Sequence, residues 1–264
     1  MTAENIILEK SDGWMTIWFN RPEVRNALSN EVIDELTAIL KGVRDDRSVR
    51  GITFRGKGNI FCAGGDIKGF KAVFQGGELD AGDVARVSRV AGELFNLVNQ
   101  MPQVVVMLVE GAAIAGGLGL VCTGDVVAVT ADAKFGITET SIGLPPAQIA
   151  PFVVRRIGLS AARRYMLTGI RFDGRVAGEI GLADFVVDDA AGLDAVEAEV
   201  QRGVRRCAPG ANAVTKALAL ATQDLDMDAM MDLAGEKFAQ CMLSEEGREG
   251  VASFIEKRKP NWAE

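Results

Sequence analysis

The sequence predicts an α/β fold with parallel strands that is followed by a helical C-terminal region. In residues 1–191, apolar segments of strand length alternate with segments whose apolar residues recur at helical spacing. One strand, Val104 to Val109, is apolar without interruption, as in strands that are buried on both faces. From Gly192 to Lys257 the apolar spacing is almost wholly helical. We therefore expect an α/β core over 1–191 and a helical region over 192–264.

The chain begins with a predicted β-hairpin. Ile6 to Glu9 and Trp14 to Asn20 have the composition of strands, and the turn-forming pair Asp12-Gly13 lies between them. Ser29 is a suitable N-cap for a helix, because apolar residues at positions 32, 33, 36, 39, 40 and 43 recur at helical spacing after it. A short strand over Gly51 to Gly56 follows.

Two segments of small residues interrupt the middle of the chain. Gly56 to Gly69 is a glycine-rich loop, and residues 70–83 show little periodicity. A helix that ends before Pro102 leads to the apolar strand, and Gly111 to Gly119 is a turn of small residues that enters a short helix. Two further strands are expected, at Val126 to Thr130 and at Asp184 to Val187.

Composition and charge exclude several kinds of function. The chain has 29 Lys and Arg against 36 Asp and Glu, and the net charge of -7 disfavours non-specific binding to nucleic acid or to an anionic membrane. It has no His, which removes an imidazole base, a Ser-His pair and a His-ligated metal from this chain. We expect no metal site.

The cysteines and the N-terminus indicate the compartment. The four cysteines have no CxxC spacing, and residues 1–4 lack the charge pattern that opens a signal peptide. The uncharged, glycine-rich stretch Gly111 to Gly124 is too short for a bilayer, which needs about 20 apolar residues. We therefore expect a reduced, cytoplasmic protein that does not enter membranes.

Two glycine-rich segments are candidates for chemistry: Phe61-Cys62-Ala63-Gly64-Gly65-Asp66-Ile67 and Gly111 to Gly119. A backbone can approach a ligand closely only where side chains are missing, and a free N–H at a turn can donate to a developing oxyanion. Neither segment has the GxGxxG or GxxxxGK[ST] spacing of nucleotide-binding loops. From the residues alone, they fit either an oxyanion site or tight turns and helix-packing contacts.

Five motifs in register give the chain a resemblance to the crotonase family of enoyl-CoA hydratases and isomerases. They are Asn20-Arg21-Pro22-Glu23-Val24-Arg25-Asn26-Ala27-Leu28-Ser29, Phe61 to Ile67, Gly116-Gly117-Leu118-Gly119-Leu120 through Asp125, Phe135-Gly136-Ile137-Thr138-Glu139 and Ile142-Gly143-Leu144-Pro145-Pro146. The resemblance covers nearly the whole chain. It implies a crotonase-like spiral of ββα units over 1–191 and a helical trimerisation region over 192–264, assembled as a homotrimer or a dimer of trimers.

The resemblance also implies a ligand and the residues that hold it. The ligand is an acyl-CoA thioester, and its oxygen is held by the backbone N–H groups of Gly65 and Gly116. Coenzyme A is part of the substrate, so no separate cofactor is expected. The residues implied along the CoA path are Arg25, Ala27, Ala63, Asp66 and Ile67, with Phe254 and Lys257 reaching it from the helical tail of this or a neighbouring subunit. For Arg25 and Lys257 the alternative is a solvated surface charge.

One of the family's two usual glutamates is missing. Hydratases of the family typically hold a water between two glutamates; the second is present as Glu139, and Gly119 stands at the position of the first. Glycine has no side chain that accepts or donates a proton. Three functions stay open: a hydratase that adds water across the 2,3 double bond, which we favour, a Δ3,Δ2-enoyl-CoA isomerase that uses Glu139 alone, and a non-catalytic acyl-CoA-binding homologue.

The segment after Glu139 also departs from the family pattern. Gln148, or the N–H of Ala147, is expected to help hold a water in place of the missing glutamate. Small residues at Gly119, Ala147 and Ala150 predict extra room near the acyl chain.

The pair Glu139-Thr140 resembles the one in methylglutaconyl-CoA hydratases, so a branched or glutaconyl-type substrate is a candidate. Apolar neighbours at Phe135, Ile137 and Ile142 are expected to raise the pKa of Glu139.

Overall fold

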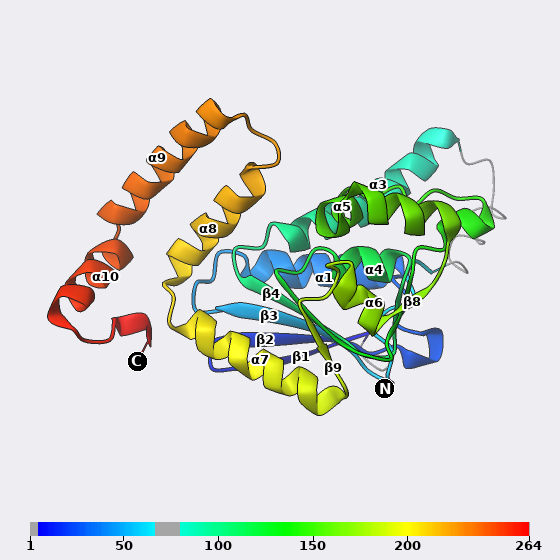
Figure 1. The fold of residues 1–264 in the computed structure, drawn as a ribbon, viewed down its shortest axis with the longest axis horizontal. Coiled ribbons are helices and arrows are strands. Elements are labelled where there is room, and N and C mark those ends of the chain that lie inside the picture. The colour runs from blue at the N-terminus through cyan, green and yellow to red at the C-terminus, as the bar shows by residue number, and fades with distance from the viewer. Residues whose placement is uncertain (1–4, 67–79, 264) are drawn as a thin grey trace.

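The computed structural model describes residues 5–66 and 80–263 and shows a six-stranded sheet flanked by helices (Figure 1). The strand order is β1-β2-β3-β4-β6-β9. The first two strands pair antiparallel and every later pair is parallel, which confirms the predicted fold class. The strands are β1 (Ile6–Ser11), β2 (Trp14–Phe19), β3 (Gly51–Gly56), β4 (Val104–Val109), β6 (Val126–Thr130) and β9 (Phe185–Val187).

The predicted hairpin is confirmed. Ser11 of β1 lies opposite Trp14 of β2, so Asp12 and Gly13 form a two-residue turn. Both turn residues have positive φ, 50° and 72°, as the turn type that matches the twist of a hairpin requires.

A second, three-stranded sheet has the order β5-β7-β8, with β5 (Ala112–Ile114), β7 (Lys134–Gly136) and β8 (Phe172–Asp173). Isolated parallel bridges extend it, joining Cys62 to Ala113 and Leu28 to Gly65. After β3, β4 and β6, the chain therefore leaves the large sheet and enters the small one each time. This repetition is the spiral of two-strand units that the family resemblance implies.

Helices cover both faces of the large sheet. Figure 1 shows α1 (Asn30–Val43), α3 (Ala81–Asn99), α4 (Gly116–Val121) and α5 (Ala150–Thr168) over one face and α7 (Ala190–Arg205) over the other. Ser29 caps α1 by accepting a hydrogen bond from the Val32 N–H, as predicted. The short α6 (Gly174–Glu179) lies between β8 and β9 in the chain.

Strand β4 divides the hydrophobic core into two parts. Because side chains alternate along a strand, Val105, Met107 and Val109 pack into the larger cluster, and Val106 and Leu108 pack with α7. All five are at most 1 % exposed, so the prediction of a strand buried on both faces is confirmed.

The C-terminal helices α8 (Pro209–Ala221), α9 (Met227–Leu243) and α10 (Glu245–Glu256) form an arm that projects from the core (Figure 1). Lys216 attaches α8 to the sheet by pairing with Asp125 and by donating to the carbonyl of Gln103 at 2.6 Å. The helical character predicted for this region is confirmed. Helix α7 still packs on the sheet, and α8 to α10 project from it. The domain boundary at residue 191 stays a prediction.

The described residues also include the short 3-10 helices η1 (Pro22–Val24), η2 (Glu139–Ile142) and η3 (Asn261–Ala263). Within residues 5–66 and 80–263, no helix combines the length and the apolar character needed to cross a bilayer.

Candidate active site

Gly65 and Gly116 lie side by side although they are far apart in the sequence. A methyl group built on Gly116 would lie 3.6 Å from the Gly65 nitrogen, and one built on Gly64 would lie 3.1 Å from the Gly116 nitrogen. The bridge between Cys62 and Ala113 holds the two glycine-rich segments together. The small sheet therefore brings two candidate backbone donors to one place.

The N–H of Gly65 is turned toward this place by its neighbours. Leu28 donates to the Gly64 carbonyl at 2.8 Å, and Asp66 donates to the Leu28 carbonyl at 3.2 Å. These bonds use the groups on either side of Gly65, so its own N–H points to the opposite edge, where Gly116 lies. The backbone at Gly64 has a positive φ of 92°, which glycine adopts without steric cost.

The N–H of Gly116 is presented by a strained turn. Ala115, which precedes it, has φ 52° and ψ -123°, a conformation that a residue with a Cβ rarely adopts. Its N–H donates to the carbonyl of Gly136 at 2.8 Å, which fixes the turn. Gly116 is the first residue of α4, and N–H groups of a first helical turn have no partner within the helix. Strain of this kind is typical of functional sites.

Glu139 is a half-buried acid with an unsatisfied oxygen. It opens η2, three residues after Gly136, whose carbonyl contacts the start of α4. Its Oε2 is buried and has no hydrogen-bond partner. Burial raises the pKa of the Glu139 carboxyl, against the opposing effect of its own N–H and that of Thr138. Of the apolar neighbours expected to cause this rise, Phe135 and Ile137 are fully buried, whereas Ile142 is 57 % exposed.

The extra room predicted at Gly119 is absent. A methyl group built on Gly119 would lie 2.6 Å from the Cβ of Ile149 and closer still to its Cγ2. The prediction was wrong at this position because Ile149, thirty residues away in the sequence, fills the space. Ala147 is exposed and Ala150 is partly buried.

Gln148 is directed to α3. Its Nε2 donates to the Ser88 Oγ at 3.0 Å, and its Cδ would lie 3.0 Å from a methyl group on Gly92. The neighbouring N–H of Ala147 donates to the Pro145 carbonyl at 2.8 Å. Both groups expected to hold a water therefore have protein partners, and that role stays a prediction.

Most of the residues implied along the CoA path lie beside Gly65. The carbonyl of Arg25 accepts from the Ala63 N–H at 3.0 Å, and Ala27 directly precedes Leu28, the bridge partner of Gly65. The Arg25 side chain is exposed, and Asp66 directly follows Gly65. Ile67 lies outside the described residues.

Phe254 and Lys257 lie elsewhere. Phe254 is 85 % exposed in α10, and Lys257 caps the end of that helix. Figure 1 shows α10 on the projecting arm and α4 within the core, well apart from it. One chain alone therefore does not bring these two residues to the glycine pair.

Asn26 is a site-building residue that the sequence analysis did not single out. It is 2 % exposed; its Oδ1 accepts from the Arg21 N–H at 2.8 Å, and its Nδ2 donates to the carbonyls of Lys57 and Ile60 at 3.1 and 2.6 Å. Its positive φ of 54° is a conformation that asparagine tolerates better than most residues. Asn26 thus holds the turn that carries Arg25 and Ala27 against the segment that leads to Gly65.

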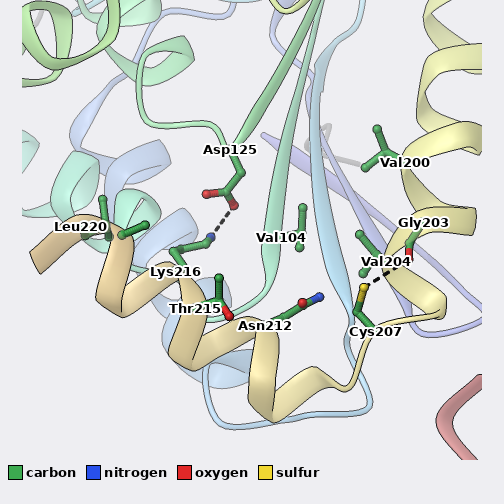
Figure 2. A pocket seen from close by; sticks show the side chains of 11 residues that line it. Val104, Asp125, Val200, Gly203, Val204, Cys207, Asn212, Thr215, Lys216 and Leu220 are labelled. Carbon is green, nitrogen blue, oxygen red and sulfur yellow. Dashed lines mark hydrogen bonds and ion pairs between the residues drawn. The ribbon is translucent and has the colours of Figure 1, made fainter. Parts of the chain in front are cut away.

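A cavity of about 440 Å³ lies away from Glu139, between α7 and α8. Figure 2 shows its apolar wall at Val104, Val200 and Val204, and the Lys216–Asp125 ion pair beside it. The glycine pair and Glu139 do not line it. In the part of the chain that the structure describes, no group of three or more His, Cys, Asp or Glu side chains is placed to bind a metal.

Comparisons with known proteins identify the family. The family model described as "Enoyl-CoA hydratase/isomerase" matches residues 9–264. A crotonyl-CoA hydratase from Syntrophomonas wolfei is 30% identical over 269 residues, which cover 99% of each chain.

Solved structures share the whole fold. The structure titled "Pseudomonas aeruginosa AtuE" is 48% identical, with a TM-score of 0.95 over 99% of this chain and 100% of that one. An enoyl-CoA hydratase/isomerase from Marinobacter aquaeolei is 40% identical, with the same TM-score and coverage. The chain belongs to the enoyl-CoA hydratase/isomerase family and is an enzyme of its hydratase-like lyase type.

Proposed function

We propose that the protein adds water across the 2,3 double bond of an enoyl-CoA thioester, with Glu139 as its acid-base group. The thioester oxygen accepts from the N–H groups of Gly65 and Gly116. The observation that carries the proposal is the buried, unpartnered Oε2 of Glu139, in a segment that touches the strained turn before Gly116. A buried carboxyl oxygen without a partner costs stability, and acids with a raised pKa are typical of active sites.

Glu139 and the two N–H groups suffice for the complete addition of water. Ionised Glu139 takes a proton from water as the water oxygen bonds to the β-carbon, and the π electrons of the double bond move to give an enolate. The two N–H groups stabilise the negative thioester oxygen; in comparable oxyanion holes, one such donor contributes about 3 kcal/mol. Protonated Glu139 then returns the proton to the α-carbon. Coenzyme A enters as part of the substrate, and no further cofactor is needed.

The test is an absorbance assay on a panel of conjugated enoyl-CoA esters. Hydration removes the conjugated double bond, so the wild-type protein should bleach the enone absorbance of at least one ester, and Glu139→Gln should not. Absence of bleaching across straight, branched and carboxylated esters would contradict the proposal.

The second candidate is a Δ3,Δ2-enoyl-CoA isomerase. The observation that favours it is the absence of a second carboxylate at Gly119, since one base suffices to move a proton between two carbons of the acyl chain. In the same assay a 3-enoyl ester would gain enone absorbance. The two activities are thus separated by the sign of the absorbance change.

We extend the proposal to a branched or glutaconyl-type acyl group. The pair Glu139-Thr140 supports this extension. The room expected at Gly119 does not support it, because Ile149 fills that space. The Thr140 hydroxyl donates to the Met166 carbonyl at 3.1 Å and so holds η2 against α5. Ranking kcat/KM across the ester panel tests this extension separately from hydration itself.

We also propose a homotrimer or a dimer of trimers, in which the arm of one subunit brings Phe254 and Lys257 to a neighbour's site. Large apolar side chains exposed on the arm support this, since exposed apolar patches are typical of interaction surfaces. They include Met227, Phe238, Leu243, Phe254 and Ile255, each at least 68 % exposed. Light scattering coupled to gel filtration should give a mass of three or six chains; a monomer would contradict it.

A further inference from the structure

Two helical glycines receive two consecutive side chains from the segment between η2 and α5. Gln148 packs where Gly92 of α3 has no Cβ, and Ile149 packs where Gly119 of α4 has none. The hydrogen bond from Gln148 to Ser88 fixes the first contact, and burial of Ile149 to 3 % exposure fixes the second. The segment is therefore held to both helices by side chains that need these glycines.

Ile149 lies on the helix face that carries the oxyanion donor. Residues three apart in a helix share a face, so the missing side chain of Gly119 would project on the same side as that of Gly116. The Gly116 side is where Gly65 and the Phe95 ring lie, within 3.6 to 3.7 Å of a methyl group built there. Ile149 therefore fills the space one helical turn beyond the pair of N–H groups.

We propose that Ile149 is the specificity-determining residue that keeps this site to a single carboxylate. Its side chain excludes both an acidic side chain and a water from the volume above Gly119. Glu139 then faces the reacting carbons without a carboxylate at position 119 to share the work. Both proton transfers, from water and to the α-carbon, are thereby left to one group. This inference rests on the function proposed above.

The Ile149 side chain also explains why position 119 is glycine. An added methyl group would overlap Ile149, and in a well-packed interior such overlap forces the backbone or the neighbour to move. A glutamate at 119 is therefore incompatible with Ile149.

The test is a double-mutant cycle on positions 119 and 149. Gly119→Ala should lower the melting temperature by roughly 5 °C, and adding Ile149→Ala should recover at least half of that loss. The matched control is Gly42→Ala in α1, a helical glycine with nothing within 4 Å of an added methyl group, which should not lower the melting temperature. These readouts do not depend on catalysis, so they remain interpretable if the hydratase proposal fails.

The catalytic arm of the cycle uses Gly119→Glu. Alone it should reduce hydration about tenfold or more; combined with Ile149→Ala it should recover hydration and raise the ratio of hydration to isomerisation above the wild-type value. Equal melting temperatures for wild type and Gly119→Ala, or purely additive effects of the two substitutions, would overturn the packing claim. A double variant whose hydration to isomerisation ratio matches wild type would overturn the claim about specificity.

Discussion

Glu139 and Asp125 are both carboxyls whose pKa is raised by burial, but among the described residues only Asp125 of the two has a charged partner. Asp125 pairs with the Lys216 ammonium, and its Oδ2 accepts from the Val105 N–H at 2.7 Å. Glu139 has a buried Oε2 that accepts nothing. Burial alone therefore does not distinguish a functional acid from a structural one. The buried Oε2 without a partner, together with the absence of a charged partner, is what favours a functional role for Glu139.

The pair at Asp125 joins two regions of the fold. Asp125 precedes β6, whereas Lys216 lies in α8, so the ion pair attaches the arm to the sheet at the start of β6. Burial also lowers the pKa of Lys216, which Asp125 opposes. Removing either residue would leave the other charge buried without its partner, which destabilises the fold. The pair therefore has a structural role.

The largest effect is expected on activity, from Glu139→Gln. The amide keeps the shape of the side chain but cannot take a proton, so kcat should fall by about 10²–10⁴-fold. Asp125→Asn should leave the kcat of the folded enzyme unchanged. The rates of both variants are measured on the preferred ester, with the folded concentrations matched by circular dichroism. An equal loss of activity in the two variants would contradict the assignment of Glu139 as the functional acid.

The largest effect on stability is expected from Lys216→Met. Removing the cation leaves Asp125 without its charge partner, which should cost about 3 kcal/mol of unfolding free energy. The double variant with Asp125→Asn should be more stable than Lys216→Met alone, because no unpaired charge remains. Urea unfolding measures both; a double variant that loses the sum of the single losses would show that the residues do not act as a pair.

The pH dependence separates Glu139 from an ordinary surface acid. The folded pKa is raised, so the favourable contribution of Glu139 to stability is fully present below its unfolded pKa and is lost as pH rises through the folded value. Glu139→Gln should therefore gain stability relative to wild type as pH rises through that range. Melting temperatures from pH 4 to pH 8 test this, and a constant difference would contradict it.

The smallest effect is expected where a carboxylate pairs at the surface. Asp224 accepts from Arg155 at 3.1 Å, with side chains 65 % and 39 % exposed. Water competes for such a pair, so Asp224→Asn should change the unfolding free energy by less than about 1 kcal/mol. A loss as large as that of Lys216→Met would show that burial is not what distinguishes the two ion pairs.

Much of the fold and part of the site could be predicted from the sequence. The hairpin turn at Asp12-Gly13, the cap at Ser29 and the doubly buried β4 each follow from local residue patterns. Strands β5, β7 and β8 did not, because two or three residues are too few to show periodicity. They are nonetheless the elements that bring Gly65 and Gly116 together.

The remaining features depend on contacts that a linear pattern does not contain. Ile149 fills the space at Gly119 from thirty residues away, and Asn26 reaches the carbonyls of Lys57 and Ile60. Both are tertiary contacts between segments of unrelated composition. Phe254 is exposed and lies with Lys257 on the arm, away from α4, so their role at the site stays a prediction.

The most direct test of the account is an infrared titration of the Glu139 carboxyl, isolated as the difference between wild type and Glu139→Gln. Because burial raises the pKa of Glu139, a protonated carboxyl band should persist above the ordinary glutamate pKa of 4.5 and disappear at higher pH. A band that titrates at or below 4.5 would show a solvated or paired carboxylate and would contradict the central claim.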